Sequence, residues 1–226
     1  MKTLLATSVF LFLLPYSVYS QQFIRDFMNL TEETVSLNKS VVNMPGYTGS
    51  PFLSSEFTEG SITASGGIIY EKVPLRYNIF NDIFEFEKDG IPYNLDAAKY
   101  GLKVSAGGQL FVFADYNYNK ITNKGYLELL ETGNFSLYKK YKVRYDRPEP
   151  AGAYTDTKPG NFFKLPSEYF LQEGENGEKK FITKESEFLE LCGIHRQEVK
   201  TFMKNNRLKM KKESDLKEIV KFLNSL

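Results

Sequence analysis

Two glutamates, Glu85 and Glu87, are the residues best spaced for acid–base chemistry. They stand in the segment VPLRYNIFNDIFEFEKDGIPYNL, residues 73–95, where polar residues alternate with aromatic and aliphatic ones. On a β-strand, residues two apart share one face and lie ~6.6 Å apart, within the carboxylate separation of inverting glycosidases. A catalytic acid needs a raised pKa, however, and Arg76, which we expect opposite Glu87, would lower that pKa. The spacing therefore favours a cross-strand charge pair, with a carboxylate-dependent hydrolase as the alternative.

The same alternation predicts a set of binding residues. Polar side chains of residues 73–95 would line one face of a sheet, and the segment FSLYKKYKVRYD, residues 135–146, places three basic residues on one face of another strand. We assign no catalytic residue to either strand. The candidate binding residues are Arg76, Asn78, Glu85, Glu87, Lys140, Lys142 and Arg144.

A possible calcium loop occurs in DYNYNKITNKGYLE. Asp115, Asn117 and Asn119 have the spacing of calcium ligands. Lys120 stands where an EF-hand needs glycine, and Tyr126 stands where it needs a bidentate glutamate. We therefore predict a polar turn and no metal site, with a looser calcium site as the alternative.

Histidine and cysteine chemistry is limited by number. His195 is the only histidine and Cys192 the only cysteine, which excludes a two-histidine metal site and an internal disulfide. Gly193 interrupts the helix between them, so we expect a buried thiol and a surface imidazole. The chain has no phosphate loop, nucleophile elbow or dinucleotide fingerprint, so no cofactor is predicted.

A basic cluster lies near the C-terminus, around the last predicted helix. Three acidic residues, Glu213, Asp215 and Glu218, follow it closely, so we expect an ordinary solvated surface. Contact with anionic polymer or lipid headgroups is the alternative. The basic residues are Lys204, Arg207, Lys209, Lys211 and Lys212.

A four-strand antiparallel meander positions the first candidate residues. A two-residue turn at 81–82 would pair Tyr77 with Phe86 and Arg76 with Glu87. Because a slip of one residue would move every apolar side chain to the other face, the agreement between successive turns supports this register. The polar face is expected to be solvated.

The two neighbouring turns place apolar and polar side chains on the same faces of the sheet as the turn at 81–82 does. Asp89-Gly90 would pair Phe86 with Tyr93 and Glu85 with Asn94, and it makes the strand containing Pro92 an edge strand. The turn at 66–67 would bring Ile69 to the apolar face, together with Ile62, Ala64, Val73 and Leu75.

Strands and then helices follow. GQLFVFADY, KGYLELLE and FSLYKKYKVRYD read as strands, and the Pro/Gly-rich segment before 167 reads as a loop or lid. YFLQEGENGEKKFI predicts a hairpin around 176–177 that pairs Leu171 with Ile182 and Glu173 with Lys180. Three helical patterns end the chain, the last capped by Ser214, with an apolar stripe of Leu216, Ile219, Val220 and Leu223 that should pack on Val199, Phe202 and Met203.

These elements define an α+β fold: an antiparallel β-meander sheet or partly closed barrel, followed by a β-hairpin and two or three C-terminal helices. We divide the chain into a signal peptide at 1–20, an N-terminal extension at 21–56 and an antiparallel β domain at 57–146. A Pro/Gly-rich loop at 147–166 and a hairpin with helices at 167–226 complete it.

The first twenty residues predict export. Lys2 is followed by an apolar run from Leu4 to Leu14, a break at Pro15 and small residues before Gln21, which is typical of a cleaved secretory signal. No later run is long enough to span a bilayer, so no transmembrane segment is expected after signal removal. The net charge of +1 gives no global field that would attract nucleic acid.

A resemblance supports the same compartment. The hairpin LRYNIFNDIFEF after GSPFLSSEFTEGSI, together with the ending FMKNNRLKMKKESDLKEIVKFLNSL, resembles a group of uncharacterised exported envelope proteins of Bacteroidota-type bacteria. The resemblance spans roughly Gly49 to Leu95 and Phe181 to Leu226. It implies an exported envelope protein and supplies no activity, cofactor or catalytic residue.

The leading hypothesis is a non-enzymatic cell-envelope protein that binds a partner protein or surface polymer. It would act in the periplasm or outside the cell, where association with the outer membrane periphery is one option. The alternatives are a secreted carboxylate-dependent hydrolase and a calcium- or lipid-linked accessory protein.

Overall fold

The computed structural model describes residues 47–64, 66–95, 103–150 and 157–226. The predicted signal peptide and most of the N-terminal extension lie outside these residues. The strands are β1 (Tyr47–Gly49), β2 (Thr58–Thr63), β3 (Ile69–Asn78), β4 (Ile83–Lys88), β5 (Ile91–Asn94), β6 (Lys103–Ala106), β7 (Gln109–Tyr118), β8 (Ile121–Glu131), β9 (Phe135–Asp146), β10 (Gly160–Glu173) and β11 (Lys180–Phe181). The helices are α3 (Glu185–Leu191), the 3-10 turn η1 (Gly193–His195), α4 (Arg196–Asn205) and α5 (Glu213–Leu223).

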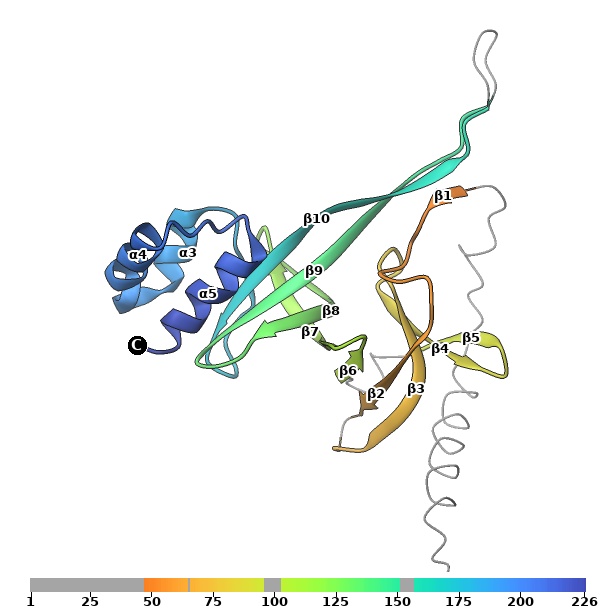
Figure 1. Ribbon diagram of the computed structural model, residues 1–226, viewed down its shortest axis with the longest axis horizontal. Coiled ribbons are helices and arrows are strands. Elements are labelled where there is room, and N and C mark those ends of the chain that lie inside the picture. The colour runs from red at the N-terminus through yellow and green to blue at the C-terminus, as the bar shows by residue number, and fades with distance from the viewer. Residues whose placement is uncertain (1–46, 65, 96–102, 151–156) are drawn as a thin grey trace, which may run out of the picture.

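The described strands form one mixed sheet in the order β1-β10-β9-β8-β7-β6-β2-β3-β4-β5 (Figure 1). Most neighbours are antiparallel, but β1 runs parallel to β10. The short strand β11 pairs with both β10 and β7. The sheet is not a closed barrel, and with the helices last in the chain it confirms the predicted α+β fold and the sheet rather than the barrel.

The β2–β5 meander is confirmed, but the register between β3 and β4 differs from the prediction. Arg76 pairs with Glu85 and Tyr77 with Phe84, so the predicted Arg76–Glu87 and Tyr77–Phe86 pairs are wrong by two residues. The connection is wider than a two-residue turn because the N–H groups of residues 79 and 80 bind the Pro51 carbonyl. Because the shift is even, every side chain keeps its predicted face.

The rest of the meander shows one confirmed turn and one bulge. The β4–β5 turn pairs Phe86 with Tyr93 as predicted, and β5 ends the sheet. Between β2 and β3 the register shifts near Lys72, which has φ +57°. This bulge reverses the facing of the strand before it, so Tyr70 is buried and Ile69 is 51% exposed, against the prediction that placed Ile69 in the core.

Strands β9 and β10 form a long hairpin that extends away from the rest of the sheet (Figure 1). Residues 160–166, predicted to belong to the Pro/Gly-rich loop, instead begin β10. Pro166 cannot donate a ladder hydrogen bond, and the sheet accommodates it with a register shift between Leu165 and Glu168. Only part of the predicted loop is therefore a connection.

The next hairpin also has a wider loop than predicted. Leu171 pairs with Lys180, so the predicted Leu171–Ile182 and Glu173–Lys180 pairs are wrong by two residues. Gln172 and Glu173 continue the ladder with β9 but have no partner in β11.

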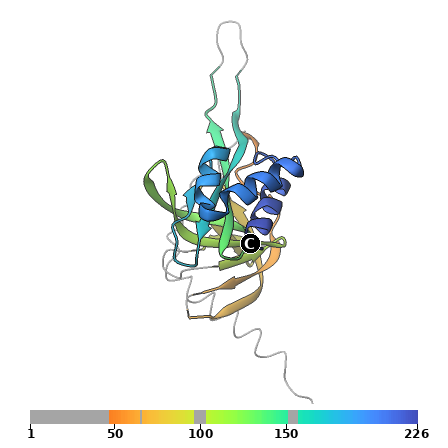
Figure 2. The ribbon, with the colours of Figure 1, turned by 90° about the vertical axis from the view of Figure 1, so that its left-hand side faces the viewer.

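The helices pack together on one end of the β9–β10 hairpin, where they lie in front of these strands in Figure 2. Their predicted stripe is confirmed: Leu216, Ile219, Val220 and Leu223 are buried in one core with Val199 and Met203. Strand β9 contributes Phe135 and Leu137 to that core, and the β10–β11 hairpin contributes Leu171 and the adjoining Ile182.

Ser214 does not cap α5. The helix begins at Glu213, and the Ser214 hydroxyl lies within its first turn and donates to Asp215. The Asp215 carboxylate instead accepts from the Lys209 backbone N–H. Among the described residues, no helix is long and apolar enough to cross a membrane.

Candidate functional site

The polar face of the β3–β4 hairpin is a buried cluster. The Arg76 guanidinium lies 2.6 Å from the Glu85 carboxylate, and the Asn78 amide donates to the same carboxylate at 3.1 Å. Asn78 is 0% exposed and Glu85 is 5% exposed. The structure therefore brings three of the predicted binding residues together, but it contradicts the expectation that this face is solvated.

Aromatic residues that precede β2 cover this cluster. The Arg76 guanidinium carbon lies 4.0 Å from the Phe52 ring centroid and 4.3 Å from that of Phe57. Such cation–π contacts, together with the ion pair, are typical of a structural arginine. Glu85 is thus ion-paired with Arg76 and covered from solvent, so its carboxylate is occupied by an internal contact. Glu87 is opposite Pro92 and does not join the Arg76 ion pair.

The Lys140 side chain is also engaged in an internal ion pair. Its ammonium lies 2.6 Å from the carboxylate of Asp82, which belongs to the β3–β4 connection, and it donates to the Tyr126 carbonyl at 3.0 Å. Burial lowers the pKa of Lys140, and the Asp82 carboxylate opposes that shift. Asp82 also accepts from the Tyr77 hydroxyl at 2.6 Å. The Asp82–Lys140 ion pair joins the meander to β9, so we assign Lys140 a structural role.

The two remaining basic candidates lie farther along β9 and are also paired. The Lys142 ammonium lies 2.6 Å from Glu168 on β10. Arg144 forms an ion pair with Asp146 at 2.8 Å, and both side chains are largely exposed. Exposed pairs of this kind contribute little to stability and remain free to exchange partners, so Arg144 is the most accessible of the predicted binding residues.

Cys192 and His195 form no nucleophilic site. Cys192 is 1% exposed, and its thiol donates to the Phe188 carbonyl at 3.3 Å. Burial raises the pKa of this thiol to about 12, so it stays protonated and unreactive near neutral pH. The expectation of a buried thiol is confirmed.

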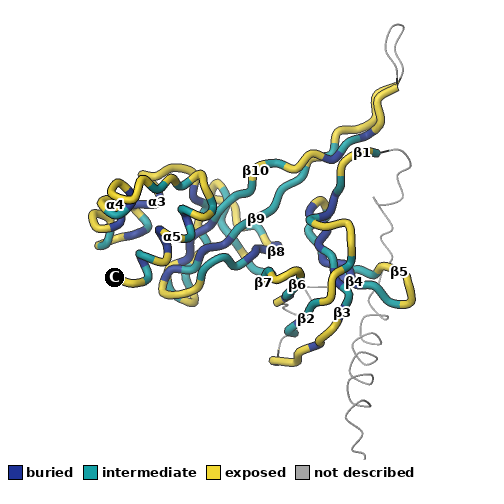
Figure 3. The backbone as a smooth tube through the Cα atoms, viewed as in Figure 1, coloured by how far each residue is buried: buried dark blue, intermediate teal, exposed yellow. Residues whose placement is uncertain are grey.

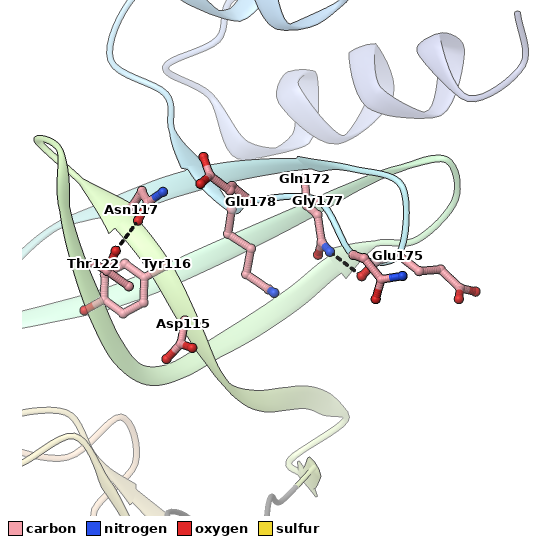
Figure 4. Close-up of a pocket in the computed structure, with 10 residues that line it drawn as sticks. Asp115, Tyr116, Asn117, Thr122, Gln172, Glu175, Gly177 and Glu178 are labelled. Carbon is pink, nitrogen blue, oxygen red and sulfur yellow. Dashed lines mark hydrogen bonds between the residues drawn. The ribbon is translucent and has the colours of Figure 1, made fainter.

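A polar pocket of about 380 Å³ lies between β7 and the β10–β11 loop. Figure 4 shows Asp115, Tyr116 and Asn117 on β7 and Gln172 near the end of β10, with the loop residues beside them. The full lining is Asp115, Tyr116, Asn117, Thr122, Gln172, Glu175, Asn176, Gly177, Glu178 and Lys179. Neither Arg76 nor either of the two central glutamates, Glu85 and Glu87, lines it.

Internal hydrogen bonds hold the walls of this pocket. The Thr122 hydroxyl donates to the Asn117 side-chain carbonyl at 2.9 Å, and the Gln172 amide donates to the Glu175 backbone carbonyl at 2.7 Å. The Asn117 backbone N–H also donates to the Lys179 carbonyl at 2.8 Å. The strand and the loop are therefore fixed to one another, which positions the polar side chains before any ligand arrives.

Opposite charges line the pocket without a direct ion pair. Burial lowers the pKa of Lys179, and the nearby Asp115 carboxylate acts in the opposite direction. None of the ion pairs between described residues joins these two groups. The Lys179 ammonium instead lies 5.1 Å from the centroid of the Tyr138 ring. A donor-only ammonium and an acceptor-only carboxylate thus share one cavity.

The segment of the possible calcium loop contains the turn between β7 and β8. Asn119 and Lys120 both have positive φ and form the tight turn between β7 and β8, which confirms the predicted polar turn. No group of three or more histidine, cysteine, aspartate or glutamate side chains is placed to hold a metal ion among the residues described.

Comparison with known proteins adds no assignment. No model of a protein family, no curated protein and no solved structure matches the chain. Function must therefore be argued from the site itself.

The sequence pointed to only two of the ten residues that line this pocket. It singled out Asp115 and Asn117, but for calcium, and it missed Gln172 and Lys179. The signal was available in part, because ENGEK has the composition of a loop. The small strand β11 that brings this loop beside β7 has only two residues, too few for a periodic pattern.

Proposed function

We propose that the protein is an exported, non-enzymatic protein of the cell envelope that binds a hydroxyl-rich surface polymer through the polar pocket. The leader pattern of residues 1–20 and the resemblance to exported envelope proteins support the compartment. The pocket supports the ligand class. The predicted binding residues Arg76, Asn78, Glu85 and Lys140 serve the fold instead.

The observation that carries the proposal is that Asp115 and Lys179 line one pocket and influence each other electrostatically without forming an ion pair. A carboxylate only accepts hydrogen bonds and an ammonium only donates them, whereas a hydroxyl does both. A ligand with adjacent hydroxyls, such as a saccharide unit, can therefore satisfy both charges at once. The amide of Asn176 lines the same pocket, and an amide group can donate a hydrogen bond to a hydroxyl or accept one from it.

The size of the pocket agrees with a short saccharide segment. Ligand sites in proteins commonly measure about 300–1,000 Å³, and this one lies near the lower limit. Tyr116 adds an aromatic surface to an otherwise polar lining. A polymer could place one or two units here while its remaining units pass outside.

Binding to a panel of soluble polysaccharides with neutral, acidic and amino-sugar repeats tests this proposal, measured by calorimetry. Asp115→Ala should weaken the observed binding at least tenfold, because a hydrogen bond to a charged group contributes about 1.5–3 kcal/mol. Asp146→Ala, which removes an exposed aspartate from the β9–β10 hairpin, is the matched control and should bind normally.

Failure of the wild-type protein to bind any member of the panel would refute the proposal. Equal binding by Asp115→Ala would refute the pocket as the site. Release of new reducing ends from a bound polysaccharide would show that the protein cleaves it, and would favour the hydrolase alternative over a binding protein.

A further inference from the structure

A second surface stands out in the connection between α4 and α5. We call residues 204–212 the basic turn. It has the sequence KNNRLKMKK, so five of its nine residues are basic, and all five are exposed. They are Lys204, Arg207, Lys209, Lys211 and Lys212.

The basic turn has a defined structure. The Leu208 N–H donates to the Met203 carbonyl at 2.9 Å, and the Lys212 N–H donates to the Lys209 carbonyl at 3.0 Å. Leu208 and Met210 pack against the helical core. Their inward side chains alternate with Lys209 and Lys211, so the cations point to solvent from a framework that the core holds in place.

Of the two acidic residues that follow the basic turn most closely, Glu213 is engaged elsewhere and Asp215 pairs with a single cation of the turn. Glu213 turns to Lys139 on β9 at 2.7 Å and accepts from the Tyr169 hydroxyl at 3.0 Å. Asp215 pairs with Lys212 at 3.1 Å and accepts from the Lys209 backbone N–H. In the part of the chain that the structure describes, Lys212 is the one cation of the basic turn that forms an ion pair with a carboxylate.

Four unneutralised cations therefore remain on one short turn of a chain whose net charge is only +1. They are Lys204, Arg207, Lys209 and Lys211. The N-terminus of α5 follows directly, and its dipole adds positive potential at the same place. The sequence alone predicted a diluted cluster, because Glu213, Asp215 and Glu218 follow it closely in the chain.

We propose that the basic turn docks the protein on the surface of an anionic lipid bilayer through contacts with phosphate headgroups. Exposed charges gain little from a single small anion in water, whereas a plane of headgroups engages several of them together. Because Leu208 and Met210 are held by the core, the contact is electrostatic and does not insert apolar side chains. This inference is independent of the polar pocket.

The test is sedimentation of the full chain with vesicles of phosphatidylcholine alone and of phosphatidylcholine with 30% phosphatidylglycerol, which is an experimental choice of roughly physiological surface charge. The wild-type protein should prefer the anionic vesicles, and the preference should fall steeply as salt rises. The variant Lys204→Gln/Arg207→Gln/Lys209→Gln/Lys211→Gln should bind them more weakly by roughly fivefold per charge, or several hundredfold in total.

A second quadruple variant separates a local site from general charge. Lys72→Gln/Lys103→Gln/Lys120→Gln/Lys184→Gln removes four exposed lysines from other parts of the surface and should retain most of the binding. All proteins carry the same residues 1–20, so any contribution from that apolar segment cancels between variants and is visible with the neutral vesicles. Circular dichroism checks that each variant is folded.

Three results would overturn the proposal: equal binding to neutral and anionic vesicles, undiminished binding by the basic-turn variant, or an equal loss in the control variant. Binding of soluble inorganic polyphosphate without vesicle binding would also overturn it, because a soluble polyanion would then be the partner. Preferential loss in the basic-turn variant alone would establish the docking surface.

Discussion

The helical layer and the β2–β5 meander both pack on the rest of the sheet through apolar side chains, but among the described residues only the meander adds a buried ion pair to that contact. The helices bury an apolar stripe against the β9–β10 hairpin, as the buried segments of Figure 3 show. The meander shares its apolar core with β6, β7 and β8, through Val104, Phe111 and Tyr126. Its β3–β4 connection is in addition tied to β9 by the Asp82–Lys140 ion pair. A regular apolar stripe is visible in sequence, whereas an ion pair between residues 58 positions apart is not. The comparison therefore separates packing that is encoded locally from packing that is encoded only by the whole fold.

The largest expected effect is on the helical layer. Leu216→Ala should lower the free energy of unfolding by about 2–5 kcal/mol, because Leu216 is 1% exposed and its removal leaves a cavity. Leu226→Ala, at an exposed position three residues beyond α5, is the control and should change stability by less than about 0.5 kcal/mol. Chemical denaturation measures both. Equal stability of the two variants would mean that α5 is an appendage.

The stability that the Asp82–Lys140 contact contributes should depend on the charge of the two side chains rather than on their volume. Asp82→Asn keeps the side-chain shape but leaves the Lys140 ammonium buried without its anion. The expected loss is about 3 kcal/mol, at the lower end for a broken buried pair, because the Asp82 side chain is 27% exposed. Asp146→Asn, which breaks an exposed pair, should cost about 0–1 kcal/mol.

Adding Lys140→Met to Asp82→Asn sharpens this test. The double variant should recover part of the stability, because no unpaired charge remains buried. If the double variant is as unstable as the sum of the two single variants, the pair does not couple the meander to β9.

A smaller effect distinguishes the observed register from the predicted one. A double-mutant cycle between Arg76→Ala and Glu85→Ala should give a coupling of about 1–3 kcal/mol, since the two side chains are in direct contact. The matched cycle between Arg76→Ala and Glu87→Ala should give a coupling near zero. A coupling energy between Arg76 and Glu87 instead of Glu85 would support the predicted register with its two-residue turn.

The smallest effect concerns two tyrosines: Tyr116 on β7, which is influenced by Asp82 of the meander, and Tyr169 on β10, which donates a hydrogen bond to Glu213 of α5. Burial, followed by the charge of Asp82, raises the pKa of Tyr116 to about 12. Burial and a hydrogen bond to Glu213 raise the pKa of Tyr169 to about 12. Both pKa values lie above the ordinary value of 10, so the stability from these groups is complete below pH 10 and is lost as the pH rises towards 12.

Absorbance at the wavelength of tyrosinate measures this titration. Tyr116→Phe and Tyr169→Phe should each remove one late ionisation and leave the earlier ones in place. Ionisation of either phenol at pH 10 in the folded protein would contradict the burial of that side chain.

Much of the fold was predictable because its signals are local. The stripe of Leu216, Ile219 and Val220 follows the helical period, and the strands from 109 to 146 follow their alternation. The errors occurred where a distant residue intervenes. Pro51 widens the β3–β4 connection, and no pattern within residues 73–95 records its contact.

The candidate sites were less predictable for the same reason. Arg76, Glu85 and Lys140 were predicted as binding residues from their types and spacing, but their partners decide whether they bind a ligand or support the fold. Asp82 looked like a turn residue and is the anion of a buried pair. Lys179 looked like an ordinary loop lysine, and the two-residue strand β11 brings it beside Asp115.

The lack of a side chain at Gly125 leaves room for the Asp82–Lys140 ion pair, and this should restrict which substitutions related sequences can carry. A side-chain carbon at this position in β8 would collide with the carboxylate of Asp82. Positions 82, 125 and 140 thus belong to three separate elements yet occupy one small space. Divergence should respect that confinement: a lineage that replaces Gly125 with a larger residue must first or simultaneously abandon Asp82, and Lys140 should then drift to an uncharged residue. The three positions are expected to evolve as a unit, so their joint variation would reveal the fold in a set of related sequences.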